Sequence, residues 1–483
     1  MRELAILPWE RLVRVECSPI KAIKNILSAK EALMKLTGAT TEDQIGQNGP
    51  SIGALPSAEN ADISSLNIFK TYFGRNSLIS ALDVRDVYPR LLRATLLFHA
   101  SNQGVKYSKY AEEEPGRTFH EYSKENPEAP GNWEYPYYGD VSGPVIFVNA
   151  FCTQASVEGV GFFHERYLGR DHRDHTMEHS FLSALGWIMT RLRGNEEVLL
   201  EHKPWFEGSL ENQVWKDSWD AYHHDDGSIA NHKQGVASIE VQALLYDALL
   251  RSANTVCQLA RIKRHKLRYE HMSRELRREA AHLQAQIMRF FWTKDQRGGY
   301  FVLGTDRDDQ GGLRQLKVRT SNMGHLLDSE VLAGDSAETE QKRTALVQAL
   351  FSEEMMAPAG IRTLSNREKR FGSGRYHCGS VWPWDNYRIS VGLERHGYLA
   401  EAEFLQGRIL NIVRKTKKFP EFVRGGGEGE PFESRRTVDV WDHENKRRNR
   451  IEQPAQEIVD WTVSSVVAIE HKNRQRMVRR TEA

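Results

Sequence analysis

Apolar residues recur at steps of three and four along much of the chain, which is the period of an amphipathic helix. The clearest stripe joins Leu276, Ala280, Leu283, Ile287 and Phe290. Because residues at this spacing share one face of a helix, we expect a long helix here that buries a single apolar stripe.

Two further stripes come with helix start or stop signals. One covers 181–192 and is followed by Gly194, a residue that commonly ends helices. Another begins at Pro89, which suits a first helical turn, and stops at Gly104. Weaker periodicity predicts further helices at about 236–262, 340–353, 385–396, 399–415 and 456–470.

Strand signals are few. Tyr300–Gly304 and Leu313–Val318 flank a polar turn rich in Asp and Gly, and they predict one small β-hairpin. Alternating strand–helix units are absent, so neither a Rossmann sheet nor a TIM barrel is indicated. The pattern predicts an all-α chain.

Long loops rich in Gly, Trp, His and acidic residues separate the predicted helices, at 112–145, 203–235, 298–325, 362–385 and 417–453. Long ordered loops in compact domains tend to be functional. Five of the eleven tryptophans lie in two of these loops: Trp205, Trp215, Trp219, Trp382 and Trp384. This distribution predicts a wide, aromatic-lined cleft at one end of a helical barrel.

Composition narrows the class of partner. The 483 residues are 40% hydrophobic and 27% charged, which is typical of a globular protein with a full core. The 66 basic and 65 acidic side chains nearly cancel, so we expect no general attraction to polyanions and no nucleic-acid partner.

The cysteines and the apolar runs predict a reducing environment. Cys17, Cys152, Cys257 and Cys378 are scattered, so neither a disulfide framework nor a zinc site is indicated. The first ten residues lack the apolar run of a signal peptide, and we see no stretch near the 18 or so apolar residues of a membrane helix. We therefore expect a cytoplasmic protein without a membrane partner.

The length permits one large catalytic domain. We expect a helical N-terminal lead-in over 1–55 and the catalytic domain over 56–471. The segment 472–483 is basic and polar, and we expect it to be disordered.

Two acidic loops about 200 residues apart carry the candidate chemistry. Asp217 lies in Gln213-Val214-Trp215-Lys216-Asp217-Ser218, and Glu421 lies in Phe419-Pro420-Glu421-Phe422. Glycosidic hydrolysis needs two carboxyl groups, one to protonate the leaving oxygen and one to activate water. The structural alternative is that both carboxylates cap helices or pair with arginines.

Nine loop motifs, read in order over roughly 65–470, resemble the amylo-α-1,6-glucosidase domain of glycogen-debranching-type enzymes. They are Phe73-Gly74-Arg75-Asn76-Ser77, Glu113-Glu114-Pro115-Gly116-Arg117, Tyr137-Tyr138-Gly139, Gln213 to Ser218, Ile239-Glu240-Val241-Gln242, Ser321-Asn322-Met323-Gly324-His325-Leu326-Leu327, Gly379-Ser380-Val381-Trp382-Pro383-Trp384-Asp385-Asn386, Phe419-Pro420-Glu421, and Gln453-Pro454-Ala455-Gln456.

This resemblance implies an (α/α)6 barrel, with Asp217 as general acid and Glu421 as general base. The chemistry suits these places, because tryptophans beside Asp217 would raise its pKa and the glycines after Glu421 would leave room for water. The other candidates are sugar-binding residues of the same motifs: Arg75, Asn76, Tyr138, Trp215, Lys216, Trp219, His325, Trp382, Trp384 and Asp385.

Two departures from the family pattern concern the sugar pocket. The family usually reads Phe-Gly-Arg-Asp-Ser where this chain has Asn76. It also usually has an aspartate near Ser142, for which Asp140 could substitute from two residues away. Both changes leave the identity of the sugar open.

Other polar residues receive a structural interpretation. We expect Glu240 to order its loop through hydrogen bonds. His172, His175 and His179 could be drawn as a metal site, but the carboxylates beside them favour surface pairing. The proposed chemistry requires no metal and no cofactor.

Three functions follow, all with a carbohydrate partner. The first is an inverting α-glucosidase of the debranching type. The second is hydrolysis of a small α-glucoside, such as a disaccharide or glucosylglycerate. The third is a catalytically inactive carbohydrate-binding homologue.

Overall fold

A computed structural model describes residues 28–47, 49–55, 70–123, 133–260, 266–428, 430, 432–442 and 447–482. Residues 1–27 lie outside the described residues, and with them Cys17 and the first half of the predicted lead-in.

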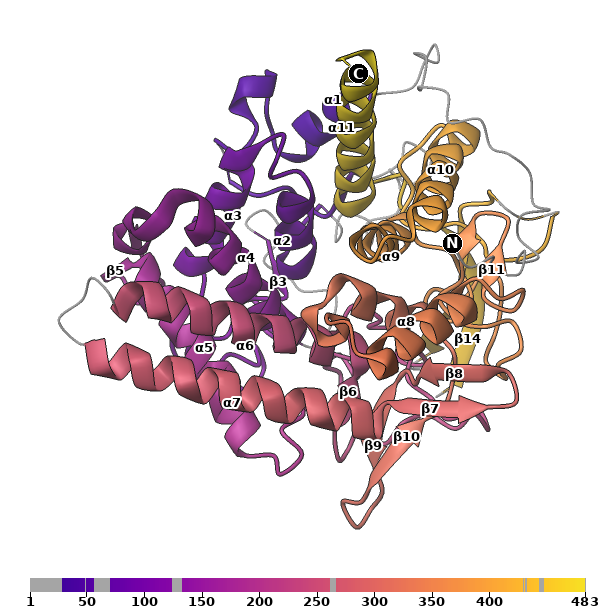
Figure 1. Ribbon diagram of the computed structural model, residues 1–483, viewed down its shortest axis with the longest axis horizontal. Coiled ribbons are helices and arrows are strands. Elements are labelled where there is room, and N and C mark those ends of the chain that lie inside the picture. Colours follow the sequence, from indigo (N-terminus) through magenta and orange to yellow (C-terminus); the bar gives the residue numbers. More distant parts are fainter. Residues whose placement is uncertain are drawn as a thin grey trace.

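Within these ranges, six helical segments form a closed inner ring (Figure 1). Each segment packs against the next, and the last packs against the first. In ring order they are α2 (Gly74–Asp83), α4 (Ser142–Glu158), α6 (Ile239–Ala260), η6 (Ser321–Asp328), α9 (Pro383–Arg395) and α11 (Asp460–Glu482). The fourth segment is a 3₁₀-helix.

An outer helix packs on each inner one. The outer helices are α3 (Pro89–Ser101) on α2, α5 (Met177–Arg193) on α4, α7 (Lys266–Phe290) on α6, α8 (Ala337–Leu350) on η6, α10 (Leu399–Thr416) on α9 and α1 (Ala29–Leu36) on α11. Six inner and six outer helices make an (α/α)6 barrel, which confirms the predicted fold class.

The outer helices follow the sequence signals closely. In α7 the stripe of Leu276, Ala280, Leu283 and Ile287 is buried. The side chain of Thr176 caps α5, where it accepts a hydrogen bond from the backbone of His179. One-sided burial explains why these helices could be predicted from periodicity.

The inner helix α4 is apolar around its circumference, as a helix buried on all sides must be. Ser142–His164, which contains α4, is by length and hydropathy the one span among the described residues that could cross a membrane. The expectation concerned an uninterrupted apolar run, and Asn149, Gln154 and Glu158 interrupt this one. Because 61% of its apolar window is buried inside the protein, the segment is explained as a core helix of the barrel.

The strands are short and form seven small sheets in the described residues. They are β1 (Ala54–Leu55), β2 (Tyr72–Phe73), β3 (Glu121–Tyr122), β4 (Arg166–Leu168), β5 (Asp174–Thr176), β6 (Val236–Ser238), β7 (Trp292–Asp295), β8 (Gly298–Phe301), β9 (Gly304–Arg307), β10 (Leu313–Leu316), β11 (Met356–Ala357), β12 (Gly360–Ile361), β13 (Arg435–Asp442), β14 (Arg447–Pro454) and β15 (Ile458–Val459).

The predicted hairpin is present, but its first strand begins at Gly304 and not at Tyr300. β10 pairs with β9, which begins at Gly304, whereas Tyr300 belongs to β8 and pairs with β7. The 417–453 segment, predicted as a loop, contains most of a second hairpin formed by β13 and β14.

Both ends of the described chain belong to the barrel wall. α1 packs on α11, and β1 pairs with β15 beside it, so the described part of the predicted lead-in is integral to the fold. The tail expected to be disordered from Lys472 onward instead continues α11 to Glu482. Lys472 and Arg476 each donate to Glu394, which anchors this turn to α9.

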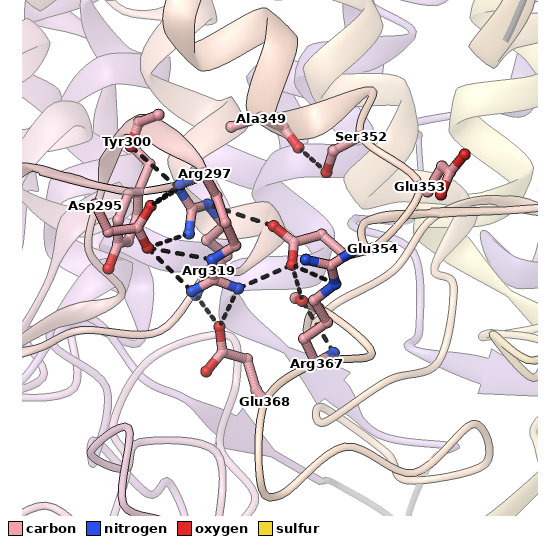
Figure 2. Close-up of polar contacts among 12 residues, drawn as sticks. Asp295, Arg297, Tyr300, Arg319, Ala349, Ser352, Glu353, Glu354, Arg367 and Glu368 are labelled. Carbon is pink, nitrogen blue, oxygen red and sulfur yellow. Dashed lines mark hydrogen bonds and ion pairs between the residues drawn. The ribbon is translucent and has the colours of Figure 1, made fainter. Parts of the chain in front are cut away.

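A network of arginines and carboxylates fastens the β7–β8 hairpin to the loop after α8 (Figure 2). The buried Arg319 donates to both carboxylate oxygens of Asp295, at 2.6 and 2.8 Å. Its Nε lies 3.6 Å from Glu354, which also accepts a 2.8 Å bond from Arg297. The loop held in this way leads directly to Thr363, whose carbonyl contacts the segment that carries Asp217.

Candidate active site

Asp217 and Glu421 line the same cavity although their loops are far apart in the chain. The cavity lies where α2, α11 and the loops before α6 and α9 meet. Arg75, Trp215 and Trp382 line it as well. The structure thus brings the two candidate carboxyl groups together, as the sequence predicts.

The carboxyl group of Asp217 is half-buried between the guanidinium of Arg75 and the ring of His377. Its Oδ2 lies 3.5 Å from Nη2 of Arg75, and its Oδ1 lies 4.0 Å from Nδ1 of His377. Desolvation by the surrounding protein raises the pKa of Asp217 above its usual value, while the charges of Arg75 and His120 oppose that rise. A raised pKa is the property that a general acid needs.

Glu421 is held from two sides. Its side chain is almost fully buried and accepts a hydrogen bond from the hydroxyl of Tyr376. Its backbone N–H donates to the carbonyl of Gln456 at 3.0 Å. The loop therefore presents the carboxylate to the cavity in one fixed position.

The glycines after Glu421 have a packing role. A Cβ atom on Gly425 would lie 1.9 Å from the carbonyl oxygen of Gly379, so only glycine permits this approach of the two loops. We expected these glycines to leave room for water. At Gly425 the space is occupied instead by the neighbouring loop that carries Tyr376.

Aromatic rings form one wall of the site. Trp215 meets Trp382 edge-on at 5.8 Å and Trp384 at 5.0 Å, and Trp384 stacks on Trp461 at 4.7 Å. Trp215, Trp382 and Trp461 line the cavity of Asp217, whereas Trp384 and His325 line a second cavity on the other side of Trp215. The packed rings give the site a rigid, apolar side.

Arg75 and Asn76 stand in the first turn of α2 and also line the cavity. The first residue of the helix must be glycine, because its backbone lies against Phe119: a Cβ atom on Gly74 would be 2.0 Å from the Phe119 carbonyl oxygen. Asn76 donates through Nδ2 to Oδ1 of the fully buried Asp460 at 3.3 Å. An aspartate in place of Asn76 would put two carboxyl groups in contact, which accounts for the amide here.

Burial raises the pKa of Asp460 to about 8. The folded protein therefore binds one more proton than the unfolded chain between about pH 4 and pH 8, and its stability falls across that window. For one group the slope is at most about 1.4 kcal/mol per pH unit. We expect Asp460→Asn to flatten this decline, as measured by urea unfolding at pH 5, 6, 7 and 8. Asp83 and Asp247, with pKa values raised to about 6 and about 7, leave a residual slope. An unchanged slope in Asp460→Asn would contradict the assignment.

Four predicted sugar-binding residues line neither cavity. Lys216 is fully buried and donates to the carbonyl of Thr363 at 2.6 Å, and burial lowers its pKa to about 8. Tyr138 is also buried and donates to the carbonyl of Asn102. Trp219 lies under the guanidinium of Arg370.

Asp385, the fourth of these residues, is fully buried and forms a 2.6 Å hydrogen bond with Nε2 of His325. The four side chains hold loops and rings in place, and their motif positions alone could not reveal this. Glu240 behaves as expected, since it accepts hydrogen bonds from Tyr222, Ser238 and Asn322.

Asp140 does not line either cavity. It is fully buried and accepts hydrogen bonds from the backbone and hydroxyl of Ser142 at the start of α4. It therefore cannot replace a sugar-binding aspartate near Ser142 by direct contact.

The sequence analysis gave no site role to Tyr376, Gln456 and Trp461, which all line the cavity. Tyr376 lies only six residues before Trp382 in a loop already singled out as functional, so its position was a usable signal. Gln456 ends one of the nine loop motifs, which was also a usable signal, whereas Trp461 falls in a predicted helix and no local pattern shows that it reaches the site.

Residues 176–425 match the family described as the mannosylglycerate hydrolase MGH1-like glycoside hydrolase domain. The match covers more than half of the chain. The chain belongs to this family. It is therefore a glycoside hydrolase, and the family match does not extend to the debranching type that the motifs imply.

Solved structures share the fold. The GH63 mannosylglycerate hydrolase from Thermus thermophilus in complex with Tris and D-glycerate is 14% identical, with 92% of this chain and 100% of that chain covered and a TM-score of 0.56. A bacterial glucoamylase in complex with acarbose is 11% identical, with 92% of this chain and 55% of that chain covered and a TM-score of 0.54. A comparison with curated proteins gives no match.

Proposed function

We propose that this MGH1-like protein hydrolyses a small α-glycoside with inversion of the anomeric centre. The observation that carries the proposal is the placement of Asp217 and Glu421 on one small cavity with aromatic walls. This reaction requires two carboxyl groups, one on each side of the sugar ring. The raised pKa of Asp217 suits it to the role of acid, which leaves Glu421 as base.

In the proposed reaction, Asp217 donates its proton to the glycosidic oxygen as the bond to the anomeric carbon breaks. Glu421, fixed by Tyr376, removes a proton from the water that attacks from the opposite face. Inversion requires about 6.5–9.5 Å between the two carboxyl groups, so that sugar and water fit between them.

The match to a mannosylglycerate hydrolase family favours a small substrate over a branched glucan. The related Thermus thermophilus enzyme has been solved in complex with glucose and in complex with Tris and D-glycerate. These observations favour a small glycoside, such as a hexosylglycerate or disaccharide, over the debranching reaction.

Arg75, Asn76, Trp215 and Trp382 are the residues that we propose for sugar binding, since all four line the cavity. The tryptophan rings suit the apolar faces of a pyranose. Arg75 and Asn76 offer N–H donors to its hydroxyl groups, and the amide of Asn76 replaces the carboxylate usual in debranching enzymes.

A substrate panel tests the proposal. It compares limit dextrin, isomaltose, trehalose, glucosylglycerate and mannosylglycerate, with proton NMR to follow the first seconds of each reaction. We expect release from one of the small glycosides, with the β-anomer of the sugar appearing first from the α-linked substrate. Preference for limit dextrin would restore the debranching function. An α-anomeric first product would exclude inversion, and failure to release sugar from any member would favour the carbohydrate-binding homologue.

A further inference from the structure

Arg75 bridges two carboxylates, and one of them lies outside the cavity. Nη1 of Arg75 donates to Oδ2 of Asp140 at 2.9 Å, while Nη2 lies 3.5 Å from Oδ2 of Asp217. The side chain of Arg75 is 5% exposed, and that of Asp140 is completely buried. A cation placed in this way between two carboxyl groups affects the pKa of both.

The start of α4 fixes Asp140 in position. Its Oδ1 accepts hydrogen bonds from the backbone N–H of Ser142 at 2.8 Å, the hydroxyl of Ser142 at 2.6 Å and the backbone N–H of Gly143 at 3.2 Å. Its other oxygen is left to face Arg75 and Nδ1 of His120, which lies 3.6 Å away. One oxygen thus anchors the helix and the other meets the cation.

Arg75 creates a difficulty for the acid of the reaction. A cation within about 4–6 Å of an aspartate lowers its pKa by about 1–3 units, because it stabilises the ionised form. Asp217 must instead keep its proton until the glycosidic oxygen accepts it. The guanidinium therefore needs a second counter-ion, and Asp140 makes the shorter contact with it.

We propose that Asp140 is a positioning residue for the hydrolysis: it holds Arg75 and offsets its charge, so that Asp217 remains able to act as an acid. The inference rests on the proposed roles of Asp217 and Glu421. In this role Asp140 supports the reaction without contacting the sugar.

Other charged groups face Asp217, and the test must hold them constant. They are His120 and Glu121 at β3, His377 in the loop before α9, and Glu421 on the opposite wall of the cavity. The charge of Asp140 raises the pKa of Asp217, against the charges of Arg75 and His120, which lower it. Removing that charge alone should lower the pKa of Asp217.

Asp140→Asn removes the charge and keeps an oxygen that can cap α4, since asparagine is as good a cap as aspartate. We expect the pKa of Asp217 to fall by about one unit, measured by ¹³C NMR of labelled aspartate carboxyls and assigned with Asp217→Asn. The basic limb of the kcat/KM profile should move to lower pH by the same amount, while the acidic limb stays. At pH values above that limb, kcat/KM of Asp140→Asn is then about tenfold lower than that of the unaltered protein.

Three further variants separate this effect from damage to the fold. Asp140→Ser also removes the charge and retains a capping side chain, so it repeats the test if the amide fails to fold. Ser142→Ala removes a bond to the other oxygen of Asp140 and should leave the titration of Asp217 in place. Arg75→Gln should move the pKa of Asp217 upward, because it removes the nearest cation.

An unchanged titration of Asp217 in both Asp140 variants would overturn the inference, whatever the activity. A shifted titration in a protein that hydrolyses no substrate would uphold the coupling and refute the proposed function. The α-fluoride of the released sugar provides a last check. Fluoride leaves without protonation, so Asp140→Asn should spare its hydrolysis, and equal losses on the fluoride and the glycoside would also overturn the inference.

Discussion

Asp217→Asn and Glu421→Gln should each lower kcat on the natural glycoside by about 10²–10⁴-fold, the usual contribution of a positioned acid or base. Both changes keep the shape of the side chain. The carboxyl of Asp217 is 29% exposed and its nearest cation is 3.5 Å away, so its loss should cost little stability. Steady-state kinetics together with thermal unfolding measure both quantities on the same samples.

The two variants should differ on an activated substrate. With the α-glycosyl fluoride, the leaving group needs no proton, so Asp217→Asn should retain most of its activity. Glu421→Gln should remain impaired, because a base is still required to activate water. Asp225→Asn and Glu433→Gln are matched controls, since both are exposed carboxylates in or beside the same loops. Near-normal turnover of the glycoside in either site variant would refute its assigned role.

The outer helices of the barrel could be predicted from the sequence because each buries one face. Helices such as α5 and α7 therefore display their apolar stripes directly. Among the inner segments, α6, α9 and α11 could also be predicted from periodicity, whereas α2, α4 and η6 could not. α2 buries Arg75, Asn76, Ser77 and other polar residues, and its sequence resembles an exposed segment.

The same ambiguity limits prediction of the site. Asp217 and Glu421 could be found from the order of the loop motifs, and the cavity brings them together. Lys216 and Asp385 belong to the same motifs but are buried hydrogen-bonding partners of Thr363 and His325. A polar residue in a functional loop can contact the substrate or support the loop, and only the fold distinguishes the two.

Contacts between distant segments were also beyond the sequence. In the sequence, Asn76 is only a departure from a motif. Its role becomes clear from its hydrogen bond to Asp460, which lies 384 residues along the chain. Similarly, the basic residues after Lys472 indicate a solvated tail until Glu394 is seen to accept hydrogen bonds from Lys472 and Arg476. In each case the role of a polar or charged side chain depends on the residue that it contacts.

Arg319→Met should lower the stability of the fold by about 1.5–3 kcal/mol, because it removes a buried guanidinium that donates charge-assisted hydrogen bonds to Asp295, while Arg297 remains beside Asp295 and Glu354. Arg319 is 1% exposed and pairs with Asp295 and Glu354. Its hydrogen bonds lower the pKa of Asp295 to about 2, so at neutral pH that carboxylate is fully ionised and depends on the pair. Urea unfolding at pH 7 measures the change.

Arg367→Met is the matched control, because it removes an arginine from the same network (Figure 2). Its side chain is 64% exposed and lies 3.7 Å from Glu354. An exposed pair of this kind contributes at most about 1 kcal/mol. If Arg319→Met costs no more than Arg367→Met, the network does not support the fold in the way its geometry indicates. If it costs the full amount, kcat should fall only where the protein unfolds, since no member of the network lines the catalytic cavity.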